Sequence, residues 1–120
     1  MIRALPIFFT ILLSVDPVLA GSFRTTATYY SNYYVGRKMA NGQRFSQNSN
    51  AVAHPYLPLG TQVKITHTRC VKYGRKCSYK KFTVTGVVKD RCRCTLDLSK
   101  GLFTQLAPLK KGRISVKVSY

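Results

Sequence analysis

Residues 80–90 of the 120-residue chain read KKFTVTGVVKD. This run predicts a β-strand over residues 80–89, bent at Gly86, because a glycine inside a strand often marks a bulge or a bend. Its apolar residues are Phe82, Val84, Val87 and Val88. The strand leads directly into Asp90, so the sequence predicts a carboxylate at a strand end.

Further strands and one helix are predicted around this strand. Residues 61–66 and 113–120 alternate apolar and polar side chains, and residues 25–34 are rich in Thr and Tyr, which suits a strand or an aromatic edge loop. Ser99 can cap a short helix that ends before Pro108. The apolar face of that helix consists of Leu102, Phe103 and Leu106. Short strands with one small helix predict a compact β-barrel, because closing a sheet removes its exposed edges.

The charge of the chain is strongly one-sided. It has 20 Lys and Arg residues against 3 acids, Asp16, Asp90 and Asp97, and a formal net charge of +17. Mechanisms that need a cluster of carboxylates, such as calcium binding, are therefore excluded, and no metal or cofactor is predicted. An apolar content of 45% supplies enough apolar surface for a folded domain despite the charge.

Residues 1–20 have the order of features typical of a secretory signal peptide. A basic residue is followed by an apolar run and then by Val-Leu-Ala, which predicts cleavage after Ala20. The alternative is a retained membrane anchor, which is disfavoured because Asp16 interrupts the apolar run. The expected product is a single domain of residues 21–120, secreted or periplasmic, with no transmembrane segment.

Four cysteines stand in the second half of the chain: Cys70, Cys77, Cys92 and Cys94. Export to an oxidising compartment favours two disulfides. A bridge between Cys92 and Cys94 would close a very tight ring, so we expect the 70/77 segment to pair with the 92/94 segment. A four-cysteine zinc site is the alternative, but the usual two-residue spacers are missing and thiolates do not persist after export.

Two longer stretches carry a family pattern. Residues 36–45 read GRKMANGQRF and residues 51–61 read AVAHPYLPLGT, and together they resemble the rare lipoprotein A (RlpA) family of double-psi β-barrel proteins. Shorter matches are ATYY at residues 27–30, KDR at 89–91 and LDLS at 96–99. The resemblance covers nearly all of residues 21–120. It implies a mainly β fold, a six-stranded double-psi β-barrel with one short helix.

The second half of the chain is also similar to expansins. Residues 87–92 read VVKDRC and fit the expansin Asp-Arg-Cys pattern, whereas the bacterial family has Gly-Pro where Cys92 and Arg93 stand. RlpA-type proteins include lytic transglycosylases that cleave peptidoglycan between MurNAc and GlcNAc with formation of an anhydro sugar. Expansin-like relatives bind or loosen wall polysaccharide without hydrolysis. These are the two functions that the resemblance implies; a third possibility is a basic secreted effector or membrane-active protein built on the barrel.

Asp90 is the predicted catalytic residue. A lytic transglycosylase can work with one carboxyl group, because the C6 hydroxyl of muramic acid attacks in place of water, and the resemblance places that carboxyl at Asp90. Asp97 precedes Ser99 and is interpreted as a helix cap or turn acceptor, so a hydrolase with two carboxylates is not expected. The family's usual Glu is Gln43 here and its following Asp is Ser46. An amide cannot act as a proton donor of the carboxylic acid type.

His54, at the family's Ala-Ala-His position, is predicted to face the groove of Asp90 and to support it. Substrate contacts are predicted for Gln43, Tyr29, Tyr30 and Arg91. The tyrosines, together with Tyr33 and Tyr34, would either stack against sugar rings or serve as packing residues. His67 has no family pattern around it and is expected at the surface.

The excess of positive charge predicts anionic partners. Its densest parts are Lys80-Lys81, Lys110-Lys111 and residues 69–76. Peptidoglycan, other cell-wall polysaccharides and anionic polymers are the expected partners of this basic surface. Specific nucleic-acid binding is not expected, since no nucleic-acid-binding motif is visible and the chain is predicted to be exported. The protein is expected to be a monomer.

Overall fold

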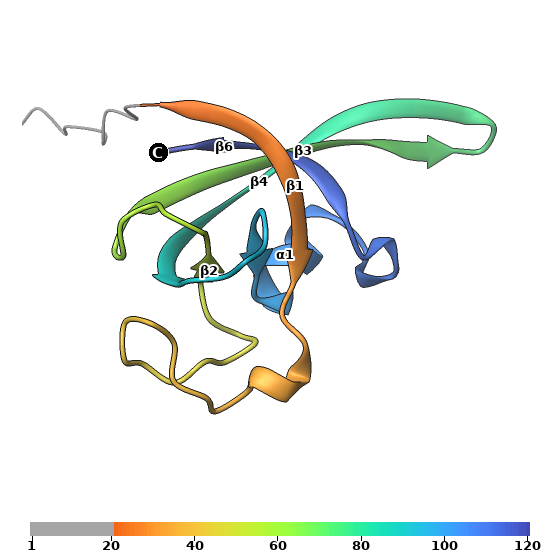
Figure 1. Ribbon diagram of the computed structural model, residues 1–120. Coiled ribbons are helices and arrows are strands. Elements are labelled where there is room, and N and C mark those ends of the chain that lie inside the picture. The colour runs from red at the N-terminus through yellow and green to blue at the C-terminus, as the bar shows by residue number, and fades with distance from the viewer. Residues whose placement is uncertain (1–20) are drawn as a thin grey trace, which may run out of the picture.

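Six β-strands close into a barrel in the spatial order β1-β5-β2-β4-β3-β6 (Figure 1). The computed structural model describes residues 21–120, and the predicted signal peptide lies outside the described residues. The strands are β1 (Ser22–Tyr29), β2 (Ala51–Ala53), β3 (Gln62–Tyr73), β4 (Lys76–Asp90), β5 (Asp97–Leu98) and β6 (Ile114–Ser119). The helices are α1 (Lys100–Leu106) and the 3-10 helices η1 (Asn32–Tyr34) and η2 (Leu109–Lys111). The predicted six-stranded barrel with one short α-helix is confirmed.

The main core fills the barrel. Strand β6 buries every second residue, as its alternating sequence predicts. Helix α1 adds its apolar face to this core, with Leu102, Phe103 and Leu106 buried. The Ser99 hydroxyl accepts a hydrogen bond from the Leu102 N–H over 3.2 Å, so the predicted N-cap is confirmed. Within residues 21–120, no helix combines the length and apolarity needed to cross a bilayer.

A second, smaller apolar cluster lies on the outer side of β2. Val52 packs in the main core, whereas its neighbours in β2 point the other way, because side chains alternate along a strand. The outer cluster consists of Tyr30, Met39, Phe45, Ala51 and Ala53. Met39 and Phe45 belong to the long connection between β1 and β2, drawn in orange and yellow in Figure 1, and they hold that connection against the barrel.

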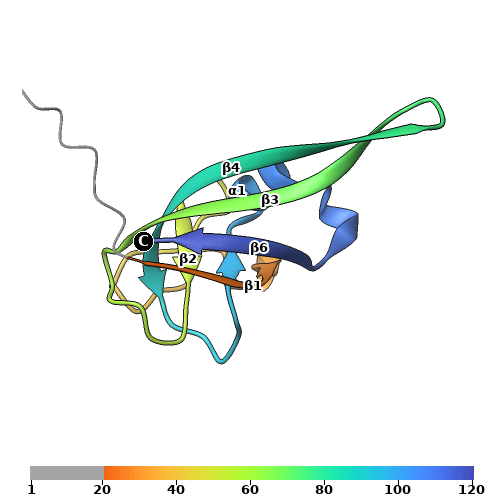
Figure 2. The same ribbon diagram turned by 90° about the horizontal axis from the view of Figure 1, so that it is seen from above.

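The β3–β4 hairpin continues beyond the barrel as a two-stranded arm. The two strands pair from Gln62 to Tyr73, but β6 pairs with β3 only over residues 64–66. Figure 2 shows the two strands leaving the barrel together. The strand predicted over residues 61–66 therefore runs further than expected, since cross-strand pairing holds its outer half. We call residues 68–81 the basic arm, because they contain Arg69, Lys72, Arg75, Lys76, Lys80 and Lys81.

The disulfide pairing differs from the expectation. Cys70 bonds to Cys77 and Cys92 bonds to Cys94, so the expected bridges between the two segments are wrong. The arm carries its cysteines away from the barrel, while the 92/94 segment follows the opposite end of β4. Each bonded pair has its Cα atoms within disulfide range, 5.4 and 5.1 Å apart. The alternative zinc site is not formed, and residues 21–120 hold no group of three or more potential metal ligands.

Candidate functional site

Four residues from four strands stand in one row on the outer side of the barrel. Thr28 in β1 pairs with Asp97 in β5. Ala53 in β2 pairs with Asp97 on one side and with Asp90 in β4 on the other. Residues paired across strands share a face of the sheet. Both carboxylates therefore lie on the same side as the outer apolar cluster, to which Ala53 belongs.

A register shift in β4 aims Asp90 at this face. Val52 pairs with Val88, and Ala53 then pairs with Asp90, so Lys89 is an extra residue in β4. A bulge of this kind re-aims the side chains that follow it. Regular pairing would set Lys89 beside Ala53 and turn Asp90 to the opposite face. Because of the bulge, the carboxylate of Asp90 and not the ammonium group of Lys89 lies beside Ala53 on this face.

Three donors hold the Asp90 carboxylate. The Tyr30 hydroxyl donates to Oδ2 over 2.7 Å, and the backbone N–H groups of Ala40 and Arg91 both donate to Oδ1 over 2.9 Å. An ionised carboxylate offers about four acceptor positions. One position on Oδ2 is thus left open by these contacts. The carboxylate is fixed in orientation and retains a place for a proton or a ligand.

Tyr30 is a buried partner of Asp90. Its side chain is 5% exposed, and its ring stacks on Phe45 with the centroids 4.1 Å apart. Burial and the hydrogen bond to Asp90 raise the pKa of Tyr30 well above its ordinary value of 10.0. Tyr30 therefore stays protonated at neutral pH and donates its hydrogen bond throughout that range.

Asp97 belongs to this row and does not cap α1. The Thr28 hydroxyl donates to its Oδ1. The expected cap role of Asp97 is wrong, because Asp97 lies in β5 and Ser99 supplies the acceptor at the start of the helix. Its place in the motif LDLS, just ahead of a helix, favours a cap, whereas the pairing of β5 turns the side chain to the face of the sheet that also carries Asp90.

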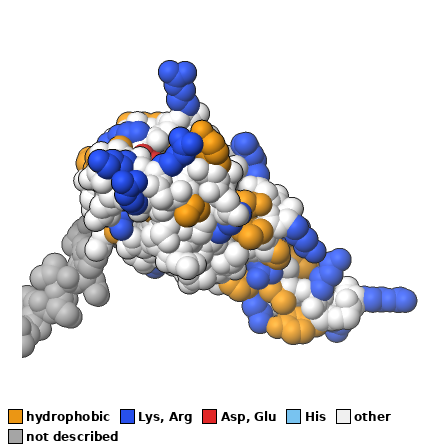
Figure 3. Space-filling model, turned by 90° about the horizontal axis from the view of Figure 1, so that it is seen from below, with side chains coloured by type: hydrophobic (Ala, Val, Ile, Leu, Met, Phe, Trp, Pro, Cys, Tyr) orange, Lys and Arg blue, Asp and Glu red, His pale blue; other side chains and the backbone are white. Residues whose placement is uncertain are grey.

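A hollow of about 280 Å³ opens at the row. It is lined by Tyr30, Tyr34, Ala53, Asp90, Arg91, Cys92, Arg93, Cys94 and Asp97. Tyr34 is 47% exposed and meets the Tyr30 ring edge-on, so it offers an aromatic wall. Figure 3 shows a small acidic area bordered by Lys and Arg side chains. Two carboxylates, an accessible aromatic ring and two arginines in one hollow suit a sugar that carries an anionic substituent.

His54 does not line this hollow. Its ring is buried, and Nδ1 accepts hydrogen bonds from the backbone N–H groups of Tyr56 and Leu57 over 3.2 and 3.1 Å. Burial, and to a smaller extent Arg91, lower the pKa of His54 below its ordinary 6.5, so the ring stays a neutral acceptor. The backbone N–H of His54 donates to the Asp90 carbonyl over 3.2 Å. The structure thus connects His54 to Asp90 through the backbone, and a role toward substrate stays a prediction.

The other predicted substrate residues have different surroundings. Arg91 lines the hollow. Gln43 lies in an exposed turn, where its Oε1 accepts a hydrogen bond from Asn41 over 3.1 Å, and it does not line the hollow. Tyr29 packs edge-on against Phe103 with the ring centroids 4.8 Å apart, in contact with the main core. Substrate contacts of Gln43, Tyr29 and Arg91 stay predictions.

Comparison with known proteins found several similar sequences. The family model described as lytic transglycolase matches residues 24–118. The uncharacterized protein ssl3177 of Synechocystis sp. is 44% identical over 94 residues, which are 78% of this chain and 93% of that protein. The probable endolytic peptidoglycan transglycosylases RlpA of Aquifex aeolicus and Nostoc sp. are 35% and 40% identical over 76% and 81% of this chain. This chain covers 38% and 25% of the length of those two proteins.

The fold also matches a solved structure. The Streptomyces papain inhibitor superimposes with a TM-score of 0.58 at 25% sequence identity, over 87% of this chain and 97% of the inhibitor. The match extends over nearly the whole described chain. The double-psi β-barrel expected from the sequence motifs is confirmed.

Proposed function

We propose that this chain, which belongs to the RlpA-like double-psi β-barrel family, is an exported lytic transglycosylase of peptidoglycan glycan strands. Relatives named as probable endolytic peptidoglycan transglycosylases support the substrate class. One geometric observation supports the chemistry: Asp90, held by three donors, keeps an open position on Oδ2 at the edge of a hollow. The three donors stabilise the carboxylate, which is the base, and the open position on Oδ2 can carry the proton of the acid, so both roles are assigned to Asp90.

The hollow suits the glycan strand. The exposed ring of Tyr34 can stack against a sugar, and tyrosine combines an apolar face with a polar tip. Arg93 lies where it can meet the lactyl carboxylate of a muramic acid residue. The guanidinium of Arg91 donates to the backbone carbonyls of His54 and Leu57 and keeps only its remaining N–H groups for a substrate. These contacts would place the glycosidic bond over the Asp90 carboxyl group.

The reaction needs one carboxyl group. Protonated Asp90 donates its Oδ2 proton to the glycosidic oxygen as the bond from that oxygen to C1 of the muramic acid residue breaks. The C6 hydroxyl of the same residue forms a new bond to C1, and the Asp90 carboxylate takes the hydroxyl proton. The products are a 1,6-anhydro sugar and a new glucosamine end, and Asp90 returns to its protonated form.

Asp97 supports a second candidate, hydrolysis. Asp90 and Asp97 flank Ala53 in register, so their Cα atoms are two inter-strand spacings, about 10 Å, apart. Carboxyl groups about 6.5 to 9.5 Å apart are typical of inverting hydrolases, in which the second carboxylate activates a water. The expectation against a hydrolase depended on Asp97 as a helix cap, which is wrong. In the transglycosylase, Asp97 would instead stabilise positive charge at C1.

Mass spectrometry of the products separates these functions. The protein is incubated with purified peptidoglycan, and anhydro products that disappear in Asp90→Asn support the proposed mechanism. Products with a free reducing end, lost in both Asp90→Asn and Asp97→Asn, would support hydrolysis instead. Absence of any product, or equal product from wild type and Asp90→Asn, would refute the role of Asp90.

Substitution of Gln43 tests whether the chain is an enzyme or a non-catalytic wall-binding module. The Gln43 side chain lies outside the hollow, so the proposed proton transfers do not involve it. We expect Gln43→Glu to change the rate by less than about threefold, which corresponds to about 0.7 kcal/mol in the barrier. An inactive wild type that becomes active on Gln43→Glu would show that the chain is a binding module without its acid.

A further inference from the structure

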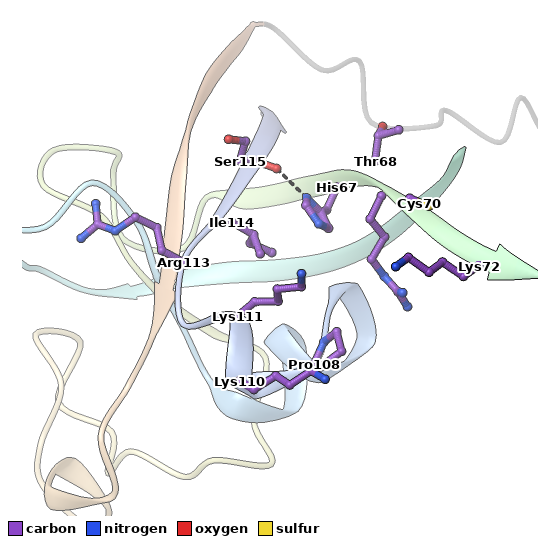
Figure 4. A pocket seen from close by; sticks show the side chains of 11 residues that line it. His67, Thr68, Cys70, Lys72, Pro108, Lys110, Lys111, Arg113, Ile114 and Ser115 are labelled. Carbon is purple, nitrogen blue, oxygen red and sulfur yellow. Dashed lines mark hydrogen bonds between the residues drawn. The ribbon is translucent and has the colours of Figure 1, made fainter. Parts of the chain in front are cut away.

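A basic groove lies at the root of the arm, away from the Asp90 hollow. It runs between β3 and the segment from η2 to the start of β6, and it has a volume of about 630 Å³ (Figure 4). Its lining residues are His67, Thr68, Arg69, Cys70, Lys72, Pro108, Lys110, Lys111, Arg113, Ile114 and Ser115. None of these residues lines the Asp90 hollow. The groove is therefore a separate feature of the described chain.

The groove concentrates positive charge without any compensating acid. Five of its lining residues are cations: Arg69, Lys72, Lys110, Lys111 and Arg113. The acids of residues 21–120 are Asp90 and Asp97, and both belong to the other site. Like charges collected in a concave site repel one another and attract an anion. The basic arm continues this charge outward from the groove.

Arg69 is held in place by two contacts within the protein. Its Nε donates to the Leu106 carbonyl over 3.0 Å, and its guanidinium carbon lies 4.1 Å from the centroid of the Phe82 ring. These contacts fix the plane of the guanidinium and leave its two terminal nitrogens for an oxyanion. An arginine fixed in this way loses less conformational freedom on binding and can form a bidentate pair. His67 is tied down as well, because its Nδ1 donates to the Ser115 carbonyl over 2.7 Å (Figure 4).

The shape and lining of the groove select among polyanions. A bilayer surface is flat on this scale and cannot enter a groove, whereas a single extended chain can. Apart from the hydrogen-bonded His67, no aromatic side chain lines the groove itself, so a nucleic acid would find no ring there on which its bases could stack. The exposed rings of Tyr73 and Tyr79 lie further out on the arm. Closely grouped cations suit a phosphodiester chain, which carries a charge every few bonds, better than a glycan strand with a carboxylate on alternate sugars.

We propose that the basic groove binds a phosphodiester-linked wall polymer of the polyol phosphate type. Arg69 takes one phosphate as a bidentate pair, and Lys110 and Lys111 meet its neighbours. The arm extends the track, since residues 67 to 73 span about 20 Å along β3. The proposal is independent of the activity proposed for Asp90, because the two sites share no residue.

Binding of poly(glycerol phosphate) to the full protein tests this proposal. Wild type and two double variants with equal loss of charge are compared by titration calorimetry at low salt. We expect Lys110→Gln/Lys111→Gln to bind roughly ten- to thirtyfold more weakly. The control Lys38→Gln/Lys64→Gln removes two exposed cations outside the groove and is expected to bind within about threefold of wild type. Equal loss in the two variants would mean binding by net charge alone and would overturn the proposal.

Two further variants and two competing ligands test whether the groove itself holds the polymer. Arg69→Lys keeps the charge but not the bidentate fork, so we expect weaker binding by a variant whose circular dichroism shows the same folded barrel. Asp90→Asn should bind the polymer as wild type does, whatever its effect on glycan cleavage. Tighter binding of oligothymidylate or of phosphatidylglycerol vesicles than of poly(glycerol phosphate) would assign the groove to another class of partner and overturn the proposal.

Discussion

Replacing Tyr30 with phenylalanine tests the contact that orients the candidate acid. The change removes one hydroxyl, which donates to Asp90 Oδ2 over 2.7 Å, and leaves the ring stacked on Phe45. A hydrogen bond to a charged group contributes about 1.5 to 3 kcal/mol. Asp90 is half-buried and water can replace part of the lost contact, so we expect about 1.5 kcal/mol of destabilisation. For a domain of this size that is a drop in melting temperature of roughly 6 to 12 °C.

The pH dependence gives this prediction a second signature. The pKa of Tyr30 is raised on folding, so its contribution to stability is complete below pH 10.0 and is lost as the pH rises above that value. Thermal melts followed by circular dichroism should therefore show a constant difference between wild type and Tyr30→Phe from pH 7 to 9. The difference should narrow above pH 10.0, because the phenylalanine variant has no hydroxyl to ionise.

A double-mutant cycle with Asp90→Asn provides the control. If the two side chains interact as the structure indicates, the double variant should be less destabilised than the sum of the single changes, by about 1 kcal/mol or more. Additive effects, or a melting temperature for Tyr30→Phe within about 2 °C of wild type, would refute the reasoning.

Three other substitutions test the packing that supports the site. His54→Asn keeps an acceptor for the backbone N–H groups of the following turn but removes the titrating ring. Because the pKa of His54 is lowered on folding, the stability of the wild type should fall as the pH drops below 6.5. Thermal melts at pH 7 and pH 5 should show a smaller fall in the variant. Gly86→Ala would set a Cβ atom 2.5 Å from Val52 Cγ2 inside the barrel, so a loss of about 1 to 3 kcal/mol is expected in urea unfolding, and an unchanged midpoint would contradict the packing. Ser99→Ala removes the N-cap of α1 at a fully buried position, and a loss of about 1 to 2 kcal/mol is expected, whereas a cap without importance would leave the unfolding midpoint unchanged.

The sequence was informative about the barrel because its strands alternate or carry family motifs. Residues 113–120 predict β6 through a regular period of two, and Ser99 predicts the start of α1 through its cap chemistry. The outer half of β3 carries no such pattern, since its residues are half-buried or exposed and none is buried. Its strands are defined by pairing with each other, which the pattern of a single segment does not reveal.

The site was predictable only in part for the same reason. Asp90 is found from its position at the end of a strand, but its direction depends on the bulge at Lys89. The pairing of Asp97 with Ala53 depends on a two-residue strand. Neither feature has a local sequence signal. Helix capping is a local effect and was therefore the stronger interpretation of Asp97, although the strand register decides its position. The disulfide pairing likewise depends on where the arm points.

The two proposed sites should respond differently to salt, because the charged arm lies far from Asp90. Asp90 lies nine residues along β4 from Lys81, the nearest cation of the arm, which is about 30 Å of strand. The screening length at 0.1 M salt is about 10 Å, so the arm exerts little direct field on Asp90 under those conditions. Local contacts between the groove and a polymer are screened much less over the few ångströms that separate them. Binding still weakens with salt, because it releases counterions from the polymer and that release is less favourable at high salt concentration. Raising the salt concentration should therefore reduce polymer binding steeply while changing the cleavage of short glycan fragments far less.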